Sequence, residues 1–442
     1  MSPSRYLFVF SQVHPDFRSA EFKAVTEIFD IPFDETLINK KEYLYVLEMA
    51  TIEHVQQILS RAMLVKYAIQ IYGSGDDHGR MHVELKKKAH LFDRFNVEGQ
   101  SFAIRVRPFG RKRDLSYMNE TIAGYGQYLP LQNANIDLVN PTNTFNIVEQ
   151  YNEKAKGFEL EKVMFGRFIG FGSGHLKTKY NLRDRSYIGN TTMDPELSFI
   201  QANLVKADKG KIGLDPFVGT GGLILPLAEF GCYVTGTELN YQIARSIGKS
   251  SRVGEGLLTE KTTHRANFEQ YGLLDKFMYH CHADASHHEL WRLQKDGSGI
   301  YDIVVADPAY GIREKARKIG YKTRKDHWTM PSSEHQVHFP EKQTYDITTM
   351  NLDLVNLGAR NLVVGGRIGY WFPVFPQEYS DDVVPLHPSL RLVANCEQPL
   401  GIKYSRRLLV FEKIKNTEVD EAAYVTRDIF KIENVRQRIF NS

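Results

Sequence analysis

From Lys211 onward, short apolar strand-like segments alternate with helical segments, and this alternation restricts the fold more than any other feature. Helices are predicted from Gly222, from Tyr241 and near Met350–Asn361, between strand-like segments that read IGLDPF, CYVTGTEL, FMYHC, YDIVVADP and RIGYWFPV. Strands that each return through a helix form a parallel, doubly wound sheet with helices on both faces. Because ligands of such sheets bind at the carboxyl ends of the strands, the residues at those ends are the functional candidates.

Three acidic or glycine-rich strand ends suggest a nucleoside site. The segment LDPFVGTGGL leaves its strand at Asp215, and Gly219 and Gly221 allow a tight turn and close approach of a ligand. Such a turn alone also occurs in dinucleotide-binding proteins. Glu238, at the next strand end, could accept both ribose hydroxyls, although an acid near the start of a helix is the alternative. Asp284 could accept the adenine amino group.

The fourth strand end, in VVADPAYG, predicts chemistry on an amino group. An aromatic amine is a weak nucleophile because its lone pair is delocalised into the ring. The Asp307 carboxylate and the Pro308 carbonyl could accept its two hydrogens and so orient the lone pair. The ring of Tyr310 could stack on an extruded base. A simple Asx-type turn is the structural alternative, which the other three strand ends make less attractive.

These motifs carry a family resemblance. LDPFVGTGG followed by ADPAYGIRE resembles Rossmann-like, class I amino methyltransferases, and the whole chain resembles the catalytic subunits of eukaryotic tRNA guanosine-10 N2-methyltransferases. The resemblance implies that S-adenosylmethionine (SAM) is the cofactor and tRNA the substrate. It also implies a small zinc-binding activator protein as heterodimer partner. Ala309 departs from the family motif Asp-Pro-Pro-Tyr, and the substitution removes rigidity rather than a hydrogen-bonding group.

By position, the resemblance also assigns site residues. Three residues would hold the base: Asp307, Pro308 and Tyr310. Six would surround SAM: Asp215, Phe217, Gly219, Gly221, Glu238 and Asp284. No metal is expected in this chain, because the spacing of His280, Cys281, His282, His287 and His288 matches no common zinc site.

The same reading divides the chain into four parts. Residues 1–165 are predicted to form an α+β region with a ferredoxin-like unit, because strands alternate with helical stripes there, and the resemblance implies that this region includes a THUMP tRNA-binding domain. Residues 166–190 read as a linker rich in Gly, Ser, Asn and charge. Residues 191–415 would form the methyltransferase domain, and residues 416–442 a charged tail that ends in a helix, Thr426–Phe440.

Two clusters of basic residues favour an RNA substrate, although the net charge of the chain is only +3. One spans residues 80–114, and the other, residues 313–325, leaves directly from the amine-binding turn. A solvated charged surface is the alternative for each cluster. The RNA-binding candidates are Lys86, Lys87, Lys88, Arg105, Arg107, Arg111, Lys112, Arg313, Lys315, Arg317 and Lys318.

Other classes of protein remain open at this stage. The same amine chemistry would serve a methyltransferase for adenine N6 or for a protein glutamine. Ala309 leaves room for a non-catalytic RNA-binding protein on a methyltransferase fold, and an oxidoreductase is disfavoured because GxGxxG is absent. No apolar run is long enough to span a membrane, and three scattered cysteines suit a reducing compartment, so we expect a cytoplasmic protein.

Overall fold

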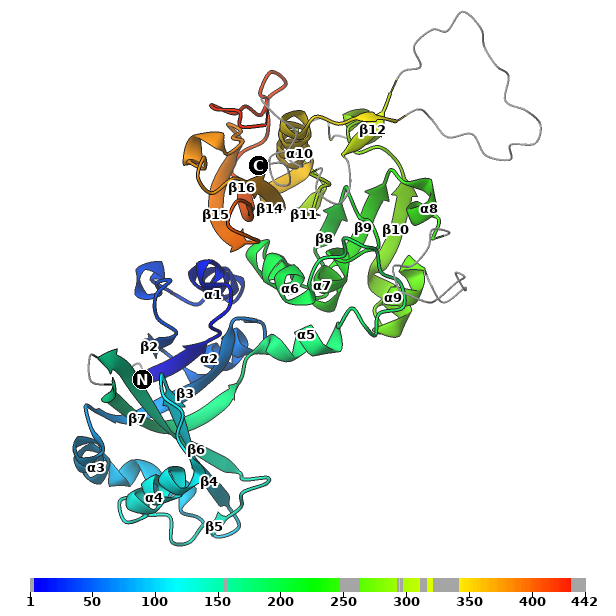
Figure 1. The fold of residues 1–442 in the computed structure, drawn as a ribbon. Helices are drawn as coiled ribbons and strands as arrows, with labels where there is room; N and C mark the ends of the chain where they lie inside the picture. Colours follow the sequence, from blue (N-terminus) through cyan, green and yellow to red (C-terminus); the bar gives the residue numbers. More distant parts are fainter. Residues whose placement is uncertain are drawn as a thin grey trace, which may run out of the picture. The chain divides into compact units, whose positions relative to one another are not determined.

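The computed structural model divides the chain into two compact units (Figure 1). One comprises Met1–Arg18 with Ile31–Gly174, and the other Ser19–Asp30 with His175–Ser442. The structure describes residues 4–154, 157–246, 263–291, 294, 297–310, 316–320 and 342–430.

The first unit is built on a seven-stranded sheet in the order β2-β1-β3-β7-β6-β4-β5. Its pairs are antiparallel except β4 with β5 and β4 with β6. The strands are β1 (Ser4–Phe10), β2 (Leu44–Met49), β3 (Val65–Gly75), β4 (Ser101–Phe109), β5 (Asn135–Ile136), β6 (Asn143–Lys154) and β7 (Gly157–Phe171). The strands predicted as a ferredoxin-like unit, β1 to β3, therefore share one sheet with the strands that follow them.

Three helices of this unit are α2 (Ile52–Leu59), α3 (His78–Lys87) and α4 (Leu115–Gly126). Met81 and Leu85 of α3 and Tyr125 of α4 pack in one buried cluster with Phe145 and Phe165 of the sheet. Both helices therefore cover the same face of the β4–β6–β7 region, and the burial of large aromatic side chains stabilises that layer.

The second unit has a seven-stranded sheet in the order β10-β9-β8-β11-β14-β16-β15. The first five strands run parallel, and β16 is antiparallel to both of its neighbours. The strands are β8 (Ile212–Asp215), β9 (Tyr233–Glu238), β10 (Phe277–His282), β11 (Tyr301–Ala306), β14 (Leu362–Val374), β15 (Leu390–Pro399) and β16 (Ser405–Lys413). The predicted parallel, Rossmann-like sheet is confirmed; the sequence analysis did not predict β15 and β16.

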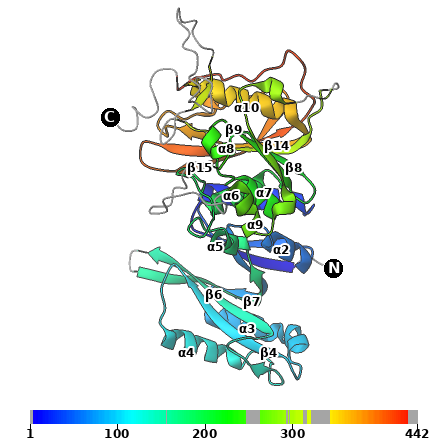
Figure 2. The same ribbon diagram turned by 90° about the vertical axis from the view of Figure 1, so that its right-hand side faces the viewer.

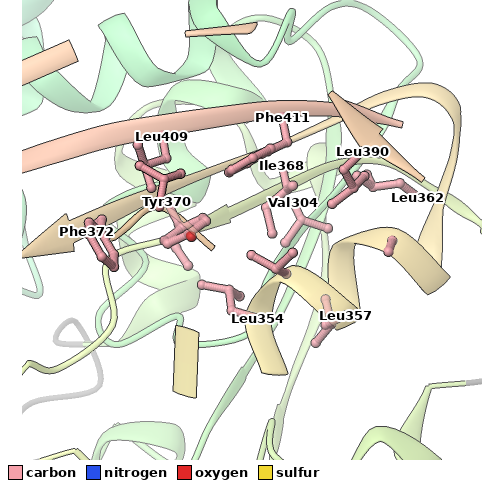
Figure 3. Packing of buried hydrophobic residues seen from close by; sticks show 14 of the residues in the cluster. Val304, Leu354, Leu357, Leu362, Ile368, Tyr370, Phe372, Leu390, Leu409 and Phe411 are labelled. Atoms are coloured by element: carbon pink, nitrogen blue, oxygen red, sulfur yellow. The ribbon is translucent and has the colours of Figure 1, made fainter. Parts of the chain in front are cut away.

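Helices cover both faces of this sheet. Figure 2 shows α10 (Ile347–Asn361) on one face and α6 (Pro195–Leu204), α7 (Ile224–Glu229) and α9 (His264–Gln270) on the other. Leu354 and Leu357 of α10 pack against Val304, Ile368 and Tyr370 of the sheet, all 2% exposed or less (Figure 3). This core fixes β11 beside β14 and so fixes the position of the residues that follow β11.

A helix from the beginning of the chain, α1 (Arg18–Ile28), belongs almost entirely to the second unit. The Asn203 side chain donates a 2.8 Å hydrogen bond to Glu21. Arg367, whose side chain is 6% exposed, pairs with Glu27 at 2.5 Å and with Glu412 at 2.9 Å. A charged group this deeply buried is costly unless it is paired, so α1 completes the charge balance of the unit.

Two predicted segments look different in the structure. The segment 166–190, expected as a linker, contains the end of β7 and a short helix, α5 (Leu176–Lys179). Residues 416–430 contain no helix, and the remainder of the predicted terminal helix lies outside the described residues.

Candidate active site

The strand order reverses between β8 and β11, and the four predicted acids lie at this edge of the sheet. Asp215 ends β8 and Glu238 ends β9, while Asp307 directly follows β11. Asp284 lies two residues beyond β10. The carboxyl ends of parallel strands at such a reversal form the ligand crevice of doubly wound sheets. The strand–helix alternation therefore located this edge correctly.

A pocket of about 510 Å³ opens at this edge, within the usual ~300–1,000 Å³ of small-molecule sites. Five of the predicted catalytic and cofactor-binding residues line it: Asp215, Phe217, Gly219, Glu238 and Asp307. One wall is the segment Tyr187–Met193, which precedes α6, and another includes Ala316, Arg317, Lys342 and Tyr345.

The glycine turn after β8 has the strained backbone that its sequence requires. Gly219 and Gly221 adopt φ angles of 50° and 84°, a region that other residues rarely occupy. The Phe217 N–H donates to the Asp215 carboxylate at 2.9 Å, and the Gly219 N–H donates to Glu238 at 3.1 Å. Both carboxylates therefore hold the turn in place and also face the pocket.

A buried histidine that the sequence analysis missed supports the same turn. Nε2 of His264 lies 2.6 Å from the Gly219 carbonyl oxygen, and Nδ1 lies 3.0 Å from Oγ of Ser246. Burial, followed by the neighbouring His280, lowers the pKa of His264 to about 4. The ring is therefore neutral at pH 7 and donates from Nε2, since a carbonyl oxygen can only accept. No local motif marks His264, because its partner lies 45 residues earlier.

The charge of the pocket suits a cationic ligand. Asp215 is 1% exposed, and its pKa lies well above the usual value because of burial and, to a smaller extent, the nearby carboxylates of Asp307 and Glu238. Three acids that converge on one cavity repel each other, and a bound cation reduces this repulsion. SAM carries a sulfonium and an ammonium group, so the residues present fit this cofactor.

The Asp-Pro-Ala-Tyr turn places its members differently around the pocket. The Asp307 side chain is 19% exposed and lines the pocket together with Ala309. Pro308 is buried, and Pro308 and Tyr310 are not among the pocket-lining residues. Burial and, next, the Asp307 charge raise the pKa of Tyr310, so its hydroxyl stays protonated. Nη1 of Arg406 donates a 3.2 Å hydrogen bond to that hydroxyl.

Two predicted cofactor residues lie beside the pocket rather than on its lining. Gly221 shapes the turn, and its neighbour Gly222 lines the wall. Asp284 is 4% exposed, and its carboxylate accepts hydrogen bonds from the N–H groups of Ser286 (2.9 Å) and Ile319 (2.5 Å). Ile319 lies on β12 (Arg317–Ile319), which pairs with β13 (Lys342–Thr344). The adenine-binding role of Asp284 stays a prediction.

The RNA-binding candidates of the first unit lie on separate surfaces. Lys86 and Lys87 are exposed on the last turn of α3, and Lys88 follows them. Arg105 and Arg107 lie on β4 and alternate with residues that pack under α3 and α4, so they point to the opposite face of the sheet. The loop after β4 exposes Arg111 and Lys112.

The second basic cluster is only partly described. Arg317 is exposed and lines the pocket, while Nζ of Lys318 lies 5.1 Å from the centre of the Tyr345 ring. Arg313 and Lys315 lie outside the described residues. Within the described part of the chain, no group of three or more His, Cys, Asp or Glu side chains could hold a metal ion. No described helix is long and apolar enough to cross a membrane.

The strand order, the pocket at the reversal and its acidic lining define a class I SAM-dependent methyltransferase. Residues 4–174 match the Tmrp11 THUMP N-terminal domain family. The chain is 33% identical over 437 residues to the tRNA (guanine(10)-N(2))-methyltransferase TRMT11 of Rattus norvegicus, covering 97% of this chain and 92% of the relative. It therefore belongs to the TRMT11 family.

Other members of the TRMT11 family show similar identity to this chain. The Homo sapiens TRMT11 is 32% identical over 438 residues, with 97% of this chain and 92% of the relative covered. The Dictyostelium discoideum TRMT11 is 31% identical over 439 residues, with 93% and 82% covered. Among solved structures, TrmN from Thermus thermophilus covers 93% of this chain and 100% of its own at 15% identity and a TM-score of 0.46.

Proposed function

We propose that this chain transfers a methyl group from SAM to the exocyclic N2 of guanosine 10 in tRNA. Membership of the TRMT11 family supports the substrate, because the relatives are named for this activity. The observation that carries the chemistry is the position of Asp307. Its carboxylate follows β11 and lines the same pocket as Asp215 and Glu238.

The chain's own groups account for the handling of the amine. The Asp307 carboxylate and the Pro308 carbonyl accept the two N2 hydrogens, which turns the nitrogen lone pair toward the pocket. SAM, when bound, supplies an electrophilic methyl group. The proton that the methylated nitrogen must lose can pass to an oxygen of Asp307. Tyr310, kept protonated, offers an aromatic face for the base.

An Asp307→Ala variant tests this role. We expect turnover on tRNA to fall roughly 100-fold or more, because a preorganised acceptor is lost. SAM affinity should change little, because SAM is held by Asp215, Glu238 and the glycine turn. Asp275→Ala removes an exposed carboxylate outside the pocket and serves as the control. Unchanged turnover of Asp307→Ala would mean that other groups of the protein bind and orient the amine.

The identity of the methylated nucleoside tests the substrate proposal. Mass spectrometry of nucleosides from tRNA methylated with labelled SAM should find label in N2-methylguanosine. Label in N6-methyladenosine would replace the substrate proposal, as would label in glutamine when a protein fraction is incubated in place of tRNA. No label in any product, despite SAM binding and the presence of a candidate activator, would favour the non-catalytic alternative.

The first unit supplies the tRNA-binding surface in this proposal. The exposed basic side chains of residues 86, 87, 111 and 112 support contact with phosphates. Charge reversal of Lys86 and Lys87 to Glu should raise the KM for tRNA and leave SAM affinity unchanged. Equal KM values for the variant and the parent would remove these lysines from the interface.

A small zinc-binding activator protein is proposed as the partner. The strand β10 ends the second sheet and exposes Met278 (49%) and Tyr279 (51%). An edge strand with exposed apolar side chains is suited to pairing with a strand of another protein. Met278→Lys should abolish co-purification with a candidate activator, whereas Val364→Lys, at a residue 55% exposed on β14, should not. Retained binding in Met278→Lys would exclude this edge.

The cytoplasmic location is likewise a proposal, and microscopy of the tagged chain tests it.

A further inference from the structure

Arg406, near the start of β16, lies against the base-binding turn in a nearly closed environment. Its backbone pairs opposite Pro373 of β14, and its side chain is 11% exposed. The guanidinium carbon lies 4.2 Å from the centre of the buried Trp371 ring. Nε donates to Oε1 of Gln398 at 2.7 Å, and Nη2 points to the sulfur of Met193 at 3.0 Å. A guanidinium stacked and bonded on several sides has a fixed orientation.

The remaining nitrogen of this guanidinium lies between two members of the Asp-Pro-Ala-Tyr turn. Nη1 donates to the Tyr310 hydroxyl at 3.2 Å and lies 3.5 Å from Oδ1 of Asp307. The second distance exceeds the usual ~2.7–3.2 Å of an N–H···O hydrogen bond. Arg406 therefore acts on Tyr310 through a hydrogen bond and on Asp307 through its charge.

The charge matters because Asp307 has acidic neighbours. Asp215 interacts with it from the end of β8, and Tyr310 and Tyr404 interact with it from its own turn and from the residue before β16. Burial, and after it the proximity of Tyr310, raises the pKa of Tyr404, so both phenols remain neutral. A positive charge beside Asp307 offsets the repulsion from Asp215 and favours the ionised carboxylate, which accepts hydrogen bonds without competing as a donor.

We propose that Arg406 is a positioning residue for methyl transfer, which holds the Asp307 carboxylate and the Tyr310 ring in the arrangement that receives the amine. The inference rests on the proposed function of the Asp307 turn. Arg406 acts through these two side chains and is not assigned a contact with substrate or cofactor.

Two substitutions separate the charge from the shape of this side chain. Arg406→Gln removes the charge, and Arg406→Lys keeps it but lacks the planar fork. Arg407→Gln is the matched control: the neighbouring arginine is equally exposed at 11% but pairs with Glu397 at 3.0 Å, away from the turn. Each full-length variant is compared with the parent for turnover on tRNA, SAM affinity, thermal stability and the pH dependence of kcat/KM.

We expect Arg406→Gln to lower kcat roughly 100-fold, as for other lost preorganised groups, with SAM affinity within about twofold of the parent. The acid limb of its kcat/KM profile should move to higher pH, because a carboxylate that loses a neighbouring cation is protonated more readily. Arg406→Lys should restore the acid limb and part of kcat, and Arg407→Gln should resemble the parent.

Specific results would overturn the inference. A parental pH profile in Arg406→Gln, or equal losses in Arg406→Gln and Arg407→Gln, would reduce Arg406 to a packing residue on Trp371. If Arg406→Gln does not fold, Arg406→Lys still tests the charge argument. Full activity together with an altered acid limb of the kcat/KM profile in Arg406→Lys would contradict that argument. A parent chain that stays inactive on tRNA in the presence of a candidate activator would instead contradict the proposed function itself.

Discussion

The carboxylate of Glu238 bonds to the backbone N–H of Gly219 at 3.1 Å and so ties the end of β9 to the turn after β8. Its other oxygen accepts from the Asn240 N–H at 2.6 Å. One side chain thus shapes the turn, begins the next segment of the chain and lines the pocket. From the sequence, Glu238 could either bind the ribose hydroxyls or have a structural role near the start of a helix. The two roles are compatible, because the same carboxylate lines the pocket and accepts backbone hydrogen bonds.

Glu238→Ala should weaken SAM binding about 10- to 100-fold, because hydrogen bonds to a charged group contribute roughly 1.5–3 kcal/mol. Calorimetric titration with SAM measures the loss. Glu269→Ala, which removes a half-exposed carboxylate from α9, is the control and should bind normally. Normal SAM affinity in Glu238→Ala would mean that the ribose contacts other groups.

His264→Ala should weaken SAM binding more mildly, about 2- to 10-fold, because one neutral hydrogen bond contributes roughly 0.5–1.5 kcal/mol. The folded pKa near 4 is below the ordinary 6.5, so His264 contributes stability above pH 6.5 that is lost as pH falls toward 4. Thermal unfolding between pH 4 and 7 should therefore depend less on pH in His264→Ala. An identical pH dependence would show that another group titrates.

SAM binding should release protons from Asp215. The raised pKa means that the free protein holds a proton there above the ordinary value of 3.8, and a cationic ligand favours the charged form. SAM affinity should therefore increase with pH over this range. The same shift makes the ligand-free fold lose stability as pH rises above 3.8, because the folded state binds the additional proton.

Calorimetry in buffers of different ionisation enthalpy counts the protons released by Asp215. Asp215→Asn should bind SAM without this release and with an affinity that no longer depends on pH in the acid range. Release of the same number of protons from Asp215→Asn would assign the effect to Glu238 or Asp307.

Ala309→Pro should preserve or raise activity. Ala309 lines the pocket, and proline at this place restores the rigidity of the family motif without removing the carbonyl of Pro308. Turnover on tRNA and SAM affinity, measured for both forms, test this. Loss of activity with normal folding would show that the turn needs the conformation or the N–H group of Ala309.

The sequence alone was enough to locate the candidate residues that lie at the end of a strand or in the turn that follows it. Asp215, Glu238, Asp284 and Asp307 follow from strand–helix alternation, because parallel strands bring their carboxyl ends together. The glycine pattern likewise predicted the positive φ angles at 219 and 221.

The supporting residues could not be located in this way. Arg406 reaches Asp307 only because β16 runs antiparallel beside β14, and that pairing joins segments far apart in the chain. His264 acts through a carbonyl group, which has no sequence signature. The basic side chains on α3 and β4 looked like one cluster, but strand alternation sends those on β4 to the other face of the sheet.

The inclusion of α1 in the second unit affects biosynthesis. This helix is among the first segments to leave the ribosome, whereas its partners Asn203, Lys206 and Arg367 are translated much later. The partner of Glu21, Asn203, is therefore made near the middle of the chain, and Arg367, a partner of Glu27, only toward its end. A fragment that begins after the THUMP region would lack α1, and the guanidinium of Arg367 would lose the counter-ion Glu27. The methyltransferase domain therefore needs this N-terminal helix and cannot simply be expressed without it.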